Sequence, residues 1–229
     1  LLTPLGAEFM ARAEDPPGGA ALPTAASPAP EDPAVTRAME ELARRSEQVH
    51  DLTARFEEQK YTALLRKPMV SRGRLRIVGD VARWETESPH EVITRRDRGE
   101  LRIYYPQQKT VEVFPLGRHS AMPDISPLPA PAELREHFRM EPIPVDGSGA
   151  GCSDEACLAL RLHPRTAVLA EHIRTIDVVV DRSTGLLRRA EVKDPDGDRT
   201  VLVFSEVRVN TGLKAEDLDL DLPAGTKEV

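Results

Sequence analysis

The sequence predicts a mainly β protein with some helix (α+β), built on a single strongly curved antiparallel sheet that forms an unclosed barrel. Three observations predict it. Apolar and polar residues alternate with a period of two in about ten short segments, which follow one another at hairpin spacing. One amphipathic helical segment precedes them, and a proline-rich helical insertion interrupts them. We therefore expect these two helical elements to cap the apolar face of the sheet.

The first helix is predicted over residues 34–50. Asp32 and Pro33 are a cap residue and a helix-tolerated proline placed just before it. Met39 and Leu42 then recur with other apolar residues at spacings of three and four, while charged residues occupy the opposite side. Both side chains are core residues in any arrangement, and they become ligand contacts only if the core encloses a cavity.

Strands are predicted wherever the alternation has a period of two, with turns at Gly, Pro, Asn and Asp. The apolar positions of the first half are expected to share one face of the sheet: Phe56, Leu75, Ile77, Trp84, Leu101, Ile103, Tyr105, Val111 and Val113. Further strands are expected at 158–162, 176–180 and 201–209. Near the end, Leu218, Leu220 and Leu222 alternate with three aspartates and predict a last edge strand, whose acidic row is either a solvated face or a docking surface for a basic partner.

The middle of the chain breaks this alternation. Prolines at 123, 127, 129 and 131 interrupt a weakly apolar stretch, and residues 132–140 are expected to form a short helix that presents Leu134 and Phe138. We expect this insertion to lie across the sheet without joining it.

Two short helices cover a long sheet only loosely, so the sequence predicts an apolar cavity beneath them. A barrel filled by its own side chains is the alternative, and Trp84 is then a core residue and not one that stacks on a ligand. The candidate cavity residues are Met39, Leu42, Phe56, Leu75, Ile77, Trp84, Leu101, Ile103, Tyr105, Val111, Val113 and Phe138.

Composition excludes several classes of function. The 31 basic and 38 acidic residues give a net charge of -7, which argues against a nucleic-acid binder. No apolar run approaches the roughly 18 residues of a membrane span. Six scattered histidines have no identifiable nucleophile beside them, and the Asp194–Asp198 run fits a hairpin turn better than a calcium loop. We therefore expect neither an enzyme nor a cofactor or metal.

Cys152 and Cys157 are the two cysteines of the chain, and their spacing suits a disulfide at the mouth of a hairpin. Two free thiols, or half of a metal site, are the alternatives. A disulfide predicts an oxidising compartment such as a periplasm. Residues 1–33 are expected to be a cloning scar and a disordered Pro/Ala-rich leader, which is either a tether or a spacer, with one folded domain over residues 34–229.

Several short motifs, in their order along the chain, resemble the LolA/LolB-like periplasmic outer-membrane lipoprotein carrier family over residues 34–229. They are the Leu-Thr-Ala-Arg-Phe-Glu-Glu-Gln strand at 52–59, Ser71-x-Gly73-x-Leu75, Arg83-Trp84 with Pro89, Tyr104-Tyr105-Pro106, Val180-Asp181 with Thr184-Gly185-Leu186, Asp196-Gly197, Phe204, Asn210 and Leu222-Pro223-x-Gly225. No single motif is specific, but their order and spacing are similar to those of the family.

The resemblance implies a LolA-like half-barrel that binds lipid under a helical lid. It also implies a monomeric periplasmic carrier that takes acylated lipoproteins from an inner-membrane release complex to an outer-membrane acceptor. The sequence departs from the family at the turn after the second barrel strand, where Gly79-Asp80 stands in place of an Arg-Pro pair tied to ligand release. The cargo and release mechanism therefore stay open. A carrier of another lipid and a lipid- or lipoprotein-sensing regulatory protein of the same fold are the alternatives.

Overall fold

The computed structural model describes residues 32–97, 99–116, 126–128, 131–145 and 151–229. The predictions for residues 1–31 and for two of the four prolines of the insertion, Pro123 and Pro129, fall outside these residues. The helices and strands are α2 (Pro33–Ser46), β1 (Asp51–Tyr61), β2 (Met69–Val78), β3 (Val81–Ser88), β4 (Val92–Arg96), β5 (Glu100–Tyr105), β6 (Thr110–Pro115), α3 (Pro131–His137), β7 (Phe138–Ile143), β8 (Cys157–Pro164), α4 (Ala167–Ala170), β9 (Thr175–Asp181), β10 (Leu187–Lys193), β11 (Arg199–Val209), the 3-10 helix η1 (Ala215–Leu218) and β12 (Lys227–Glu228).

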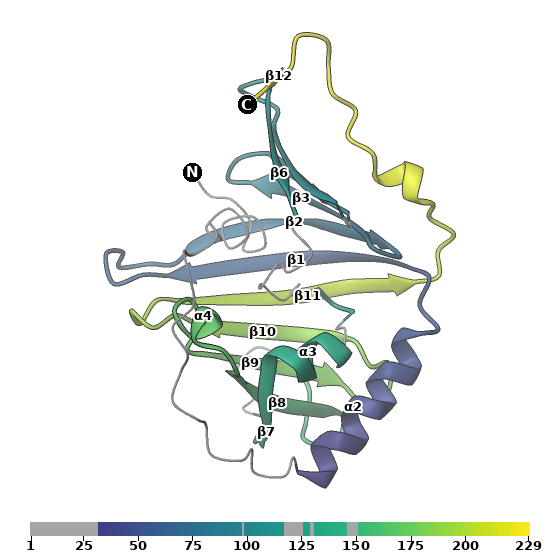
Figure 1. Cartoon of the computed structure of the whole chain (residues 1–229), viewed down its shortest axis with the longest axis vertical. Helices are drawn as coiled ribbons and strands as arrows, with labels where there is room; N and C mark the ends of the chain where they lie inside the picture. The colour runs from purple at the N-terminus through teal and green to yellow at the C-terminus, as the bar shows by residue number, and fades with distance from the viewer. Residues whose placement is uncertain (1–31, 98, 117–125, 129–130, 146–150) are drawn as a thin grey trace.

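Within the described residues the twelve strands form one sheet in the order β12-β6-β5-β4-β3-β2-β1-β11-β10-β9-β8-β7. Neighbouring strands are antiparallel except for the short parallel pair of β12 and β6. The sheet is strongly curved and does not close on itself, with α2 and α3 on its concave side (Figure 1). The fold class predicted from the alternation is therefore confirmed.

Helix α2 forms where the sequence predicts it but ends at Ser46, four residues before the predicted end. The backbone carbonyl of Asp32 accepts a hydrogen bond from the N–H of Thr36, which starts the helix. At the other end the Ser46 hydroxyl donates to the carbonyl of Ala43, and the chain turns toward β1. Between these ends, Met39 and its apolar neighbours on α2 pack onto the concave face of the sheet.

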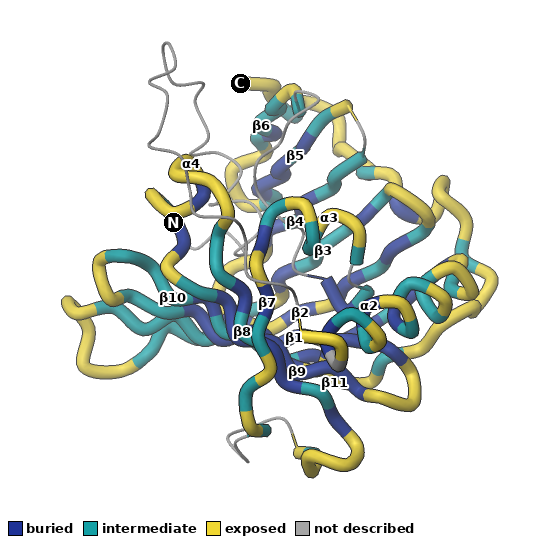
Figure 2. The backbone as a smooth tube through the Cα atoms, turned by 60° about the horizontal axis from the view of Figure 1, so that its bottom comes forward, coloured by how far each residue is buried: buried dark blue, intermediate teal, exposed yellow. Residues whose placement is uncertain are grey.

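The concave face carries the main hydrophobic core, because every second side chain of the long strands points to it. Figure 2 shows this burial running along the middle of the strands, while exposed residues gather in the turns. At the centre of the face, Trp84 lies between the rings of Phe56 and Phe204, with centroid distances of 5.1 and 6.0 Å. Gly73 makes room for this packing, since a Cβ there would lie 2.8 Å from the Phe56 ring.

The insertion contains one more strand than the sequence predicts. Helix α3 ends at His137, and Phe138 starts β7, which pairs with β8 as the last strand of the sheet. The prediction that residues 132–140 form one helix outside the sheet is therefore wrong for its last three residues, 138–140. The buried Phe138 and Met140 alternate with the exposed Arg139 and the half-buried Glu141. Because this alternation has a period of two, both apolar side chains reach the core only if the segment is a strand.

The predicted edge strand at Leu218–Leu222 is also wrong. Residues Ala215–Leu218 form a 3-10 helix, and only Leu218 of the three leucines is buried. The helix is held by a capping box in which the N–H of Lys214 donates to the carboxylate of Asp217 at 2.8 Å. Because Asp217 caps this segment, the alternation of aspartate with leucine does not produce a strand.

The C-terminal segment, residues 210–229, crosses the convex face of β2 and β3 and then pairs with β6. The start of this segment is bound to Asp51 of β1. The Asp51 carboxylate accepts hydrogen bonds from Thr211 and from the N–H of Gly212 at 2.6–2.8 Å. These bonds lower the pKa of Asp51. Further along, the backbone carbonyl of Asp217 accepts a hydrogen bond from Arg76 at 3.2 Å.

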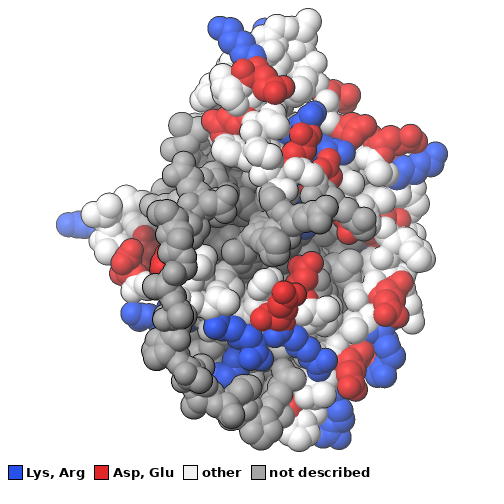
Figure 3. Space-filling model, in the orientation of Figure 1, with Lys and Arg blue, Asp and Glu red and all other residues white. Residues whose placement is uncertain are grey.

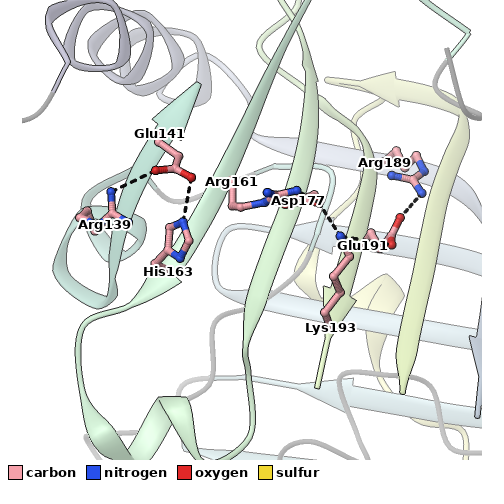
Figure 4. Close-up of polar contacts among 8 residues, drawn as sticks. All are labelled: Arg139, Glu141, Arg161, His163, Asp177, Arg189, Glu191 and Lys193. Carbon is pink, nitrogen blue, oxygen red and sulfur yellow. Dashed lines mark hydrogen bonds and ion pairs between the residues drawn. The ribbon is translucent and has the colours of Figure 1, made fainter. Parts of the chain in front are cut away.

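A network of charged side chains covers the convex face of β7–β10 (Figure 4). Asp177 lies at its centre and binds Arg161 through two hydrogen bonds of 2.7 and 2.9 Å and Lys193 through one of 2.9 Å. Burial alone raises the pKa of Asp177, but the hydrogen bonds from both cations outweigh it and lower that pKa below its usual value. At the sheet edge, Glu141 binds His163 at 3.0 Å.

We predict that the Asp177→Asn variant lowers the free energy of unfolding by about 2 kcal/mol at neutral pH, because Arg161 loses its charged partner and Lys193 loses the nearer of its two carboxylates. The folded-state pKa of Asp177 is below its unfolded value of about 3.9. Its stabilising contribution is therefore complete above about pH 4 and is lost as the pH falls through the lowered folded-state pKa.

Urea unfolding at pH 7, 5 and 3, followed by the emission of Trp84, measures the difference between variant and parent. The matched control is Asp196→Asn in the exposed turn after β10, which we expect to leave stability within about 0.5 kcal/mol of the parent. A difference between Asp177→Asn and parent that stays constant down to pH 3 contradicts the prediction.

Candidate functional site on the concave face

Two hollows bounded by described residues are large enough to hold a ligand. One has a volume of about 290 Å³ and lies where the concave face opens between the helices, and we call it the mouth pocket. Its lining comes from the end of α2, the β2–β3 turn, β4, the 126–128 segment and α3: Ser46, Glu47, Ile77, Gly79, Asp80, Ala82, Arg96, Ser126, Leu128 and Glu133. The other hollow, about 440 Å³, lies on the convex face.

The mouth pocket has an apolar floor that continues into the core. Ile77 and Ala82 face each other across the β2–β3 pair and belong to the main hydrophobic cluster. Leu128 packs against the same cluster. The neighbouring Ser126 is buried and its hydroxyl donates to the carbonyl of Leu128 at 2.9 Å, while the carbonyl of Pro127 accepts from the N–H of Leu187 at 2.8 Å. These bonds hold the 126–128 segment over the floor.

The rim of the mouth pocket is charged. Arg96 comes from β4 and is the cross-strand partner of Ala82, so its side chain is on the concave side. Glu47, Asp80 and Glu133 are exposed around the opening. Three carboxylates against one guanidinium make the rim acidic, which disfavours an anionic group at the opening. An apolar chain with a neutral or cationic polar end fits this arrangement.

The convex hollow is different in chemistry. It opens at a bulge in β11, where Thr53 pairs with Arg208 but Arg55 pairs with Ser205, and Glu206 has a φ of 51°. Arginines and glutamates form most of its lining: Arg55, Arg74, Arg76, Arg208, Glu85 and Glu206. An apolar ligand there would remove these charges from water at a high cost. We therefore take the mouth pocket as the candidate binding site.

The structure divides the predicted cavity residues into several groups. Six of them lie in the main cluster beneath α2, at 0 to 6% exposure: Met39, Leu42, Phe56, Leu75, Ile77 and Phe138. Trp84 packs against this cluster while staying partly exposed. Leu101, Ile103 and Tyr105 form a second concave cluster with Val92. Side chains fill both clusters, and of the predicted residues Ile77 alone lines the mouth pocket.

The predicted orientation of β6 is wrong. Tyr105 pairs with Thr110 across the β5–β6 turn, so Glu112 and Phe114 face the concave side, whereas Val111 and Val113 face the convex side. The contacts agree, since the Tyr105 hydroxyl donates to Glu112 at 3.2 Å and Phe114 packs on the second cluster. Val111 is buried because it aligns in register with Tyr104 and Ile93, which form an apolar row on the convex face.

Sequence reasoning missed most of the mouth pocket. Arg96 could have been found from the sequence, because it follows Val92 and Thr94 at a spacing of two and therefore shares their face of β4. An arginine at the end of that row indicates the rim of the concave face. Ser126 and Leu128 had no such pattern, because they lie in a proline-rich loop whose path depends on contacts with β10.

Cys152 and Cys157 form a disulfide with Cα atoms 6.1 Å apart. Cys157 is fully buried on the convex face in a small cluster with Ala159 and Val179. Among the described residues, no three His, Cys, Asp or Glu side chains come together as metal ligands. None of the described helices has the length and apolar character of a membrane span.

No protein-family model and no curated protein matches this chain, whereas several solved structures do. An uncharacterized conserved protein from Thermus thermophilus aligns with a TM-score of 0.55 and 11% identity over 86% of this chain and 98% of that chain. MucB aligns with a TM-score of 0.50 and 15% identity over 82% of this chain, which spans 63% of the MucB chain. A LolA superfamily protein from Nitrosomonas europaea aligns at 0.41 and 9% identity, over 80% of this chain and 98% of that one.

The first two of these likenesses show a shared fold. The architecture itself is the unclosed antiparallel sheet with few helices that the sequence predicts.

We predict that the Leu128→Ser variant weakens binding of the uncharged apolar dye Nile red about fivefold, because part of a leucine-sized apolar contact is lost at the mouth pocket. Dye fluorescence measures the affinity. The control is Arg208→Ser at the convex hollow, which leaves the affinity unchanged. Equal weakening by both variants would place the dye elsewhere and contradict the site assignment.

Proposed function

We propose that this protein is a carrier that binds the acyl chains of a lipoprotein in its concave face, with entry at the mouth pocket. The observation that carries the proposal is the continuity of the pocket floor with the main hydrophobic cluster: Ile77 and Ala82 belong to both. An acyl chain that enters there can extend between α2 and the sheet by replacing side-chain contacts with its own. An exposed acyl chain costs about 0.8 kcal/mol per methylene in water, so transit needs such a container.

The attachment of the helices supports this proposal. Helix α2 covers the core with the apolar side chains of Met39 and Leu42. Its polar links to other described elements lie at its periphery: Arg135 of α3 donates to the carbonyl of Thr36 at 3.1 Å, and Arg45 donates to the carbonyl of Ser183. Because apolar contacts are non-directional, α2 can exchange its contacts with apolar side chains of the sheet for contacts with an acyl chain while the sheet stays intact.

The acidic rim favours an acylated polypeptide over a free fatty acid or an anionic phospholipid. A carboxylate or phosphate at the opening would face Glu47, Asp80 and Glu133. Lipoprotein acyl groups are joined to the polypeptide through neutral ester and amide groups, which carry no charge to the rim. This support comes from the site itself and adds to the fold likeness.

The proposal extends to compartment and partners. The Cys152–Cys157 disulfide suits an oxidising compartment such as the periplasm. Transfer between two membranes requires a releasing complex at the inner membrane and an acceptor at the outer one. Neither nucleic acid nor catalysis enters the proposal. On the face drawn in Figure 3, described Lys and Arg side chains lie beside Asp and Glu side chains.

A chain-length series of neutral monoacylglycerols tests acyl binding. We predict that affinity rises by up to about fourfold per methylene from eight to sixteen carbons, because each buried methylene contributes up to about 0.8 kcal/mol. Displacement of Nile red measures the affinities, and glycerol alone serves as the control. Affinities that do not change with chain length contradict the proposal.

Native mass spectrometry of the protein secreted into a bacterial periplasm identifies the cargo. An acylated polypeptide supports the lipoprotein carrier, and a free lipid favours a carrier of another lipid. An empty protein in a stable complex with another protein favours a regulatory role.

A further inference from the structure

The two concave clusters are separated by a polar seam at the β3–β4 pair. The main cluster ends at Ala82 and Trp84 on β3, and the second cluster begins at Val92 on β4. Between them, Thr86 and Thr94 take the concave positions. Their register fixes this, since Thr94 is the direct partner of Trp84 and Thr86 is the direct partner of Val92.

Both threonines are buried, at 2 and 3% exposure, and neither hydroxyl has a hydrogen-bond partner among the described residues. A buried hydroxyl without a partner destabilises a fold, whereas valine has the same shape without that penalty. The neighbouring Trp84 is partly exposed, although the rest of the concave centre is packed. The seam therefore combines unused hydrogen-bonding capacity with an accessible aromatic ring.

The two hydroxyls are placed for a ligand with two acceptors. Thr86 and Thr94 are diagonal neighbours on adjacent antiparallel strands, with Cβ atoms roughly 7 Å apart. Each hydroxyl has a proton to donate and apolar surface on either side. Ester and amide carbonyls accept such hydrogen bonds and are flanked by alkyl chains, so their shape and polarity match the seam.

We infer that Thr86 and Thr94 bind the carbonyl oxygens that join the acyl chains of the ligand to its glyceryl or peptide part. The chains then extend into the clusters on the two sides of the seam. This inference rests on the proposed function and names the chemical group that the concave face recognises. It distinguishes diacyl ligands from plain hydrocarbon and from ether lipids of the same length.

The test compares dioctanoylglycerol with its diether analogue, which has the same alkyl length and no carbonyl oxygens. The emission of Trp84, the single tryptophan of the chain, reports binding from within the seam. We expect the parent protein to prefer the diester. In the Thr86→Val/Thr94→Val double variant, diester affinity falls about tenfold, diether affinity is unchanged and the melting temperature is equal or higher.

Two controls separate this role from a structural one. Thr53→Val makes the same chemical change on the convex face and is expected to keep the diester preference. Thr86→Ser/Thr94→Ser retains both hydroxyls and is expected to keep it as well. Equal losses for both probes in the valine variant, or an unchanged preference, overturn the inference.

The failure of the inference and that of the proposed function give different results. If the parent binds both probes equally, acyl binding stands and the carbonyl subsite is overturned. If the parent binds neither probe, the proposed function fails and the subsite fails with it.

Discussion

Hydrophobic burial of one face of a single long sheet is the constraint on which the rest of this structure depends. A closed barrel covers its own interior, but this sheet ends at β7 on one side and at β6 with β12 on the other. The concave face must therefore be covered by other elements, and α2 supplies much of the cover with a few apolar side chains. Because this cover is incomplete, the mouth pocket lies at the end of α2, where the helix stops and the apolar surface of Ile77 and Ala82 continues.

The two faces of the sheet are held by different kinds of interaction. The concave face is apolar and non-directional, and it tolerates exchange of one contact for another. The convex face is held by charged pairs with fixed geometry, such as the two hydrogen bonds between Arg161 and Asp177. Cross-strand pairs of this kind hold the register of the strands without using the concave face. The sheet can thus stay rigid while its apolar side accommodates a change of partner.

The sequence was informative wherever only one face of a strand is buried. The alternation in β1 and β2 placed Phe56 and Leu75 correctly, because their charged neighbours face water. It failed at β6, where Val111 on the convex side is buried and Phe114 on the concave side is only partly so, and the pattern no longer distinguishes the faces. It also failed at Leu218, whose surroundings come from distant strands.

The candidate site was less accessible to sequence reasoning than the fold. Its apolar residues are ordinary core residues by pattern, and only the tertiary structure shows that Ile77 borders a hollow. The 126–128 segment carries no periodicity, and its position follows from a bond to β10. Thr86 and Thr94 look like ordinary strand residues until their burial and hydrogen bonding are measured.

The tie between the C-terminal segment and the end of α2 has a mechanical consequence. Asn210 accepts a hydrogen bond from the N–H of His50 and donates one to the carbonyl of Gln48, so the chain is clamped just after the helix. At the far end, α2 is linked to α3 through the side-chain bond from Arg135 to Thr36. The helix is thus fastened near both ends by bonds that lie outside the hydrophobic core, so the bond to Arg135 must break before the end that carries Val35 can leave the sheet.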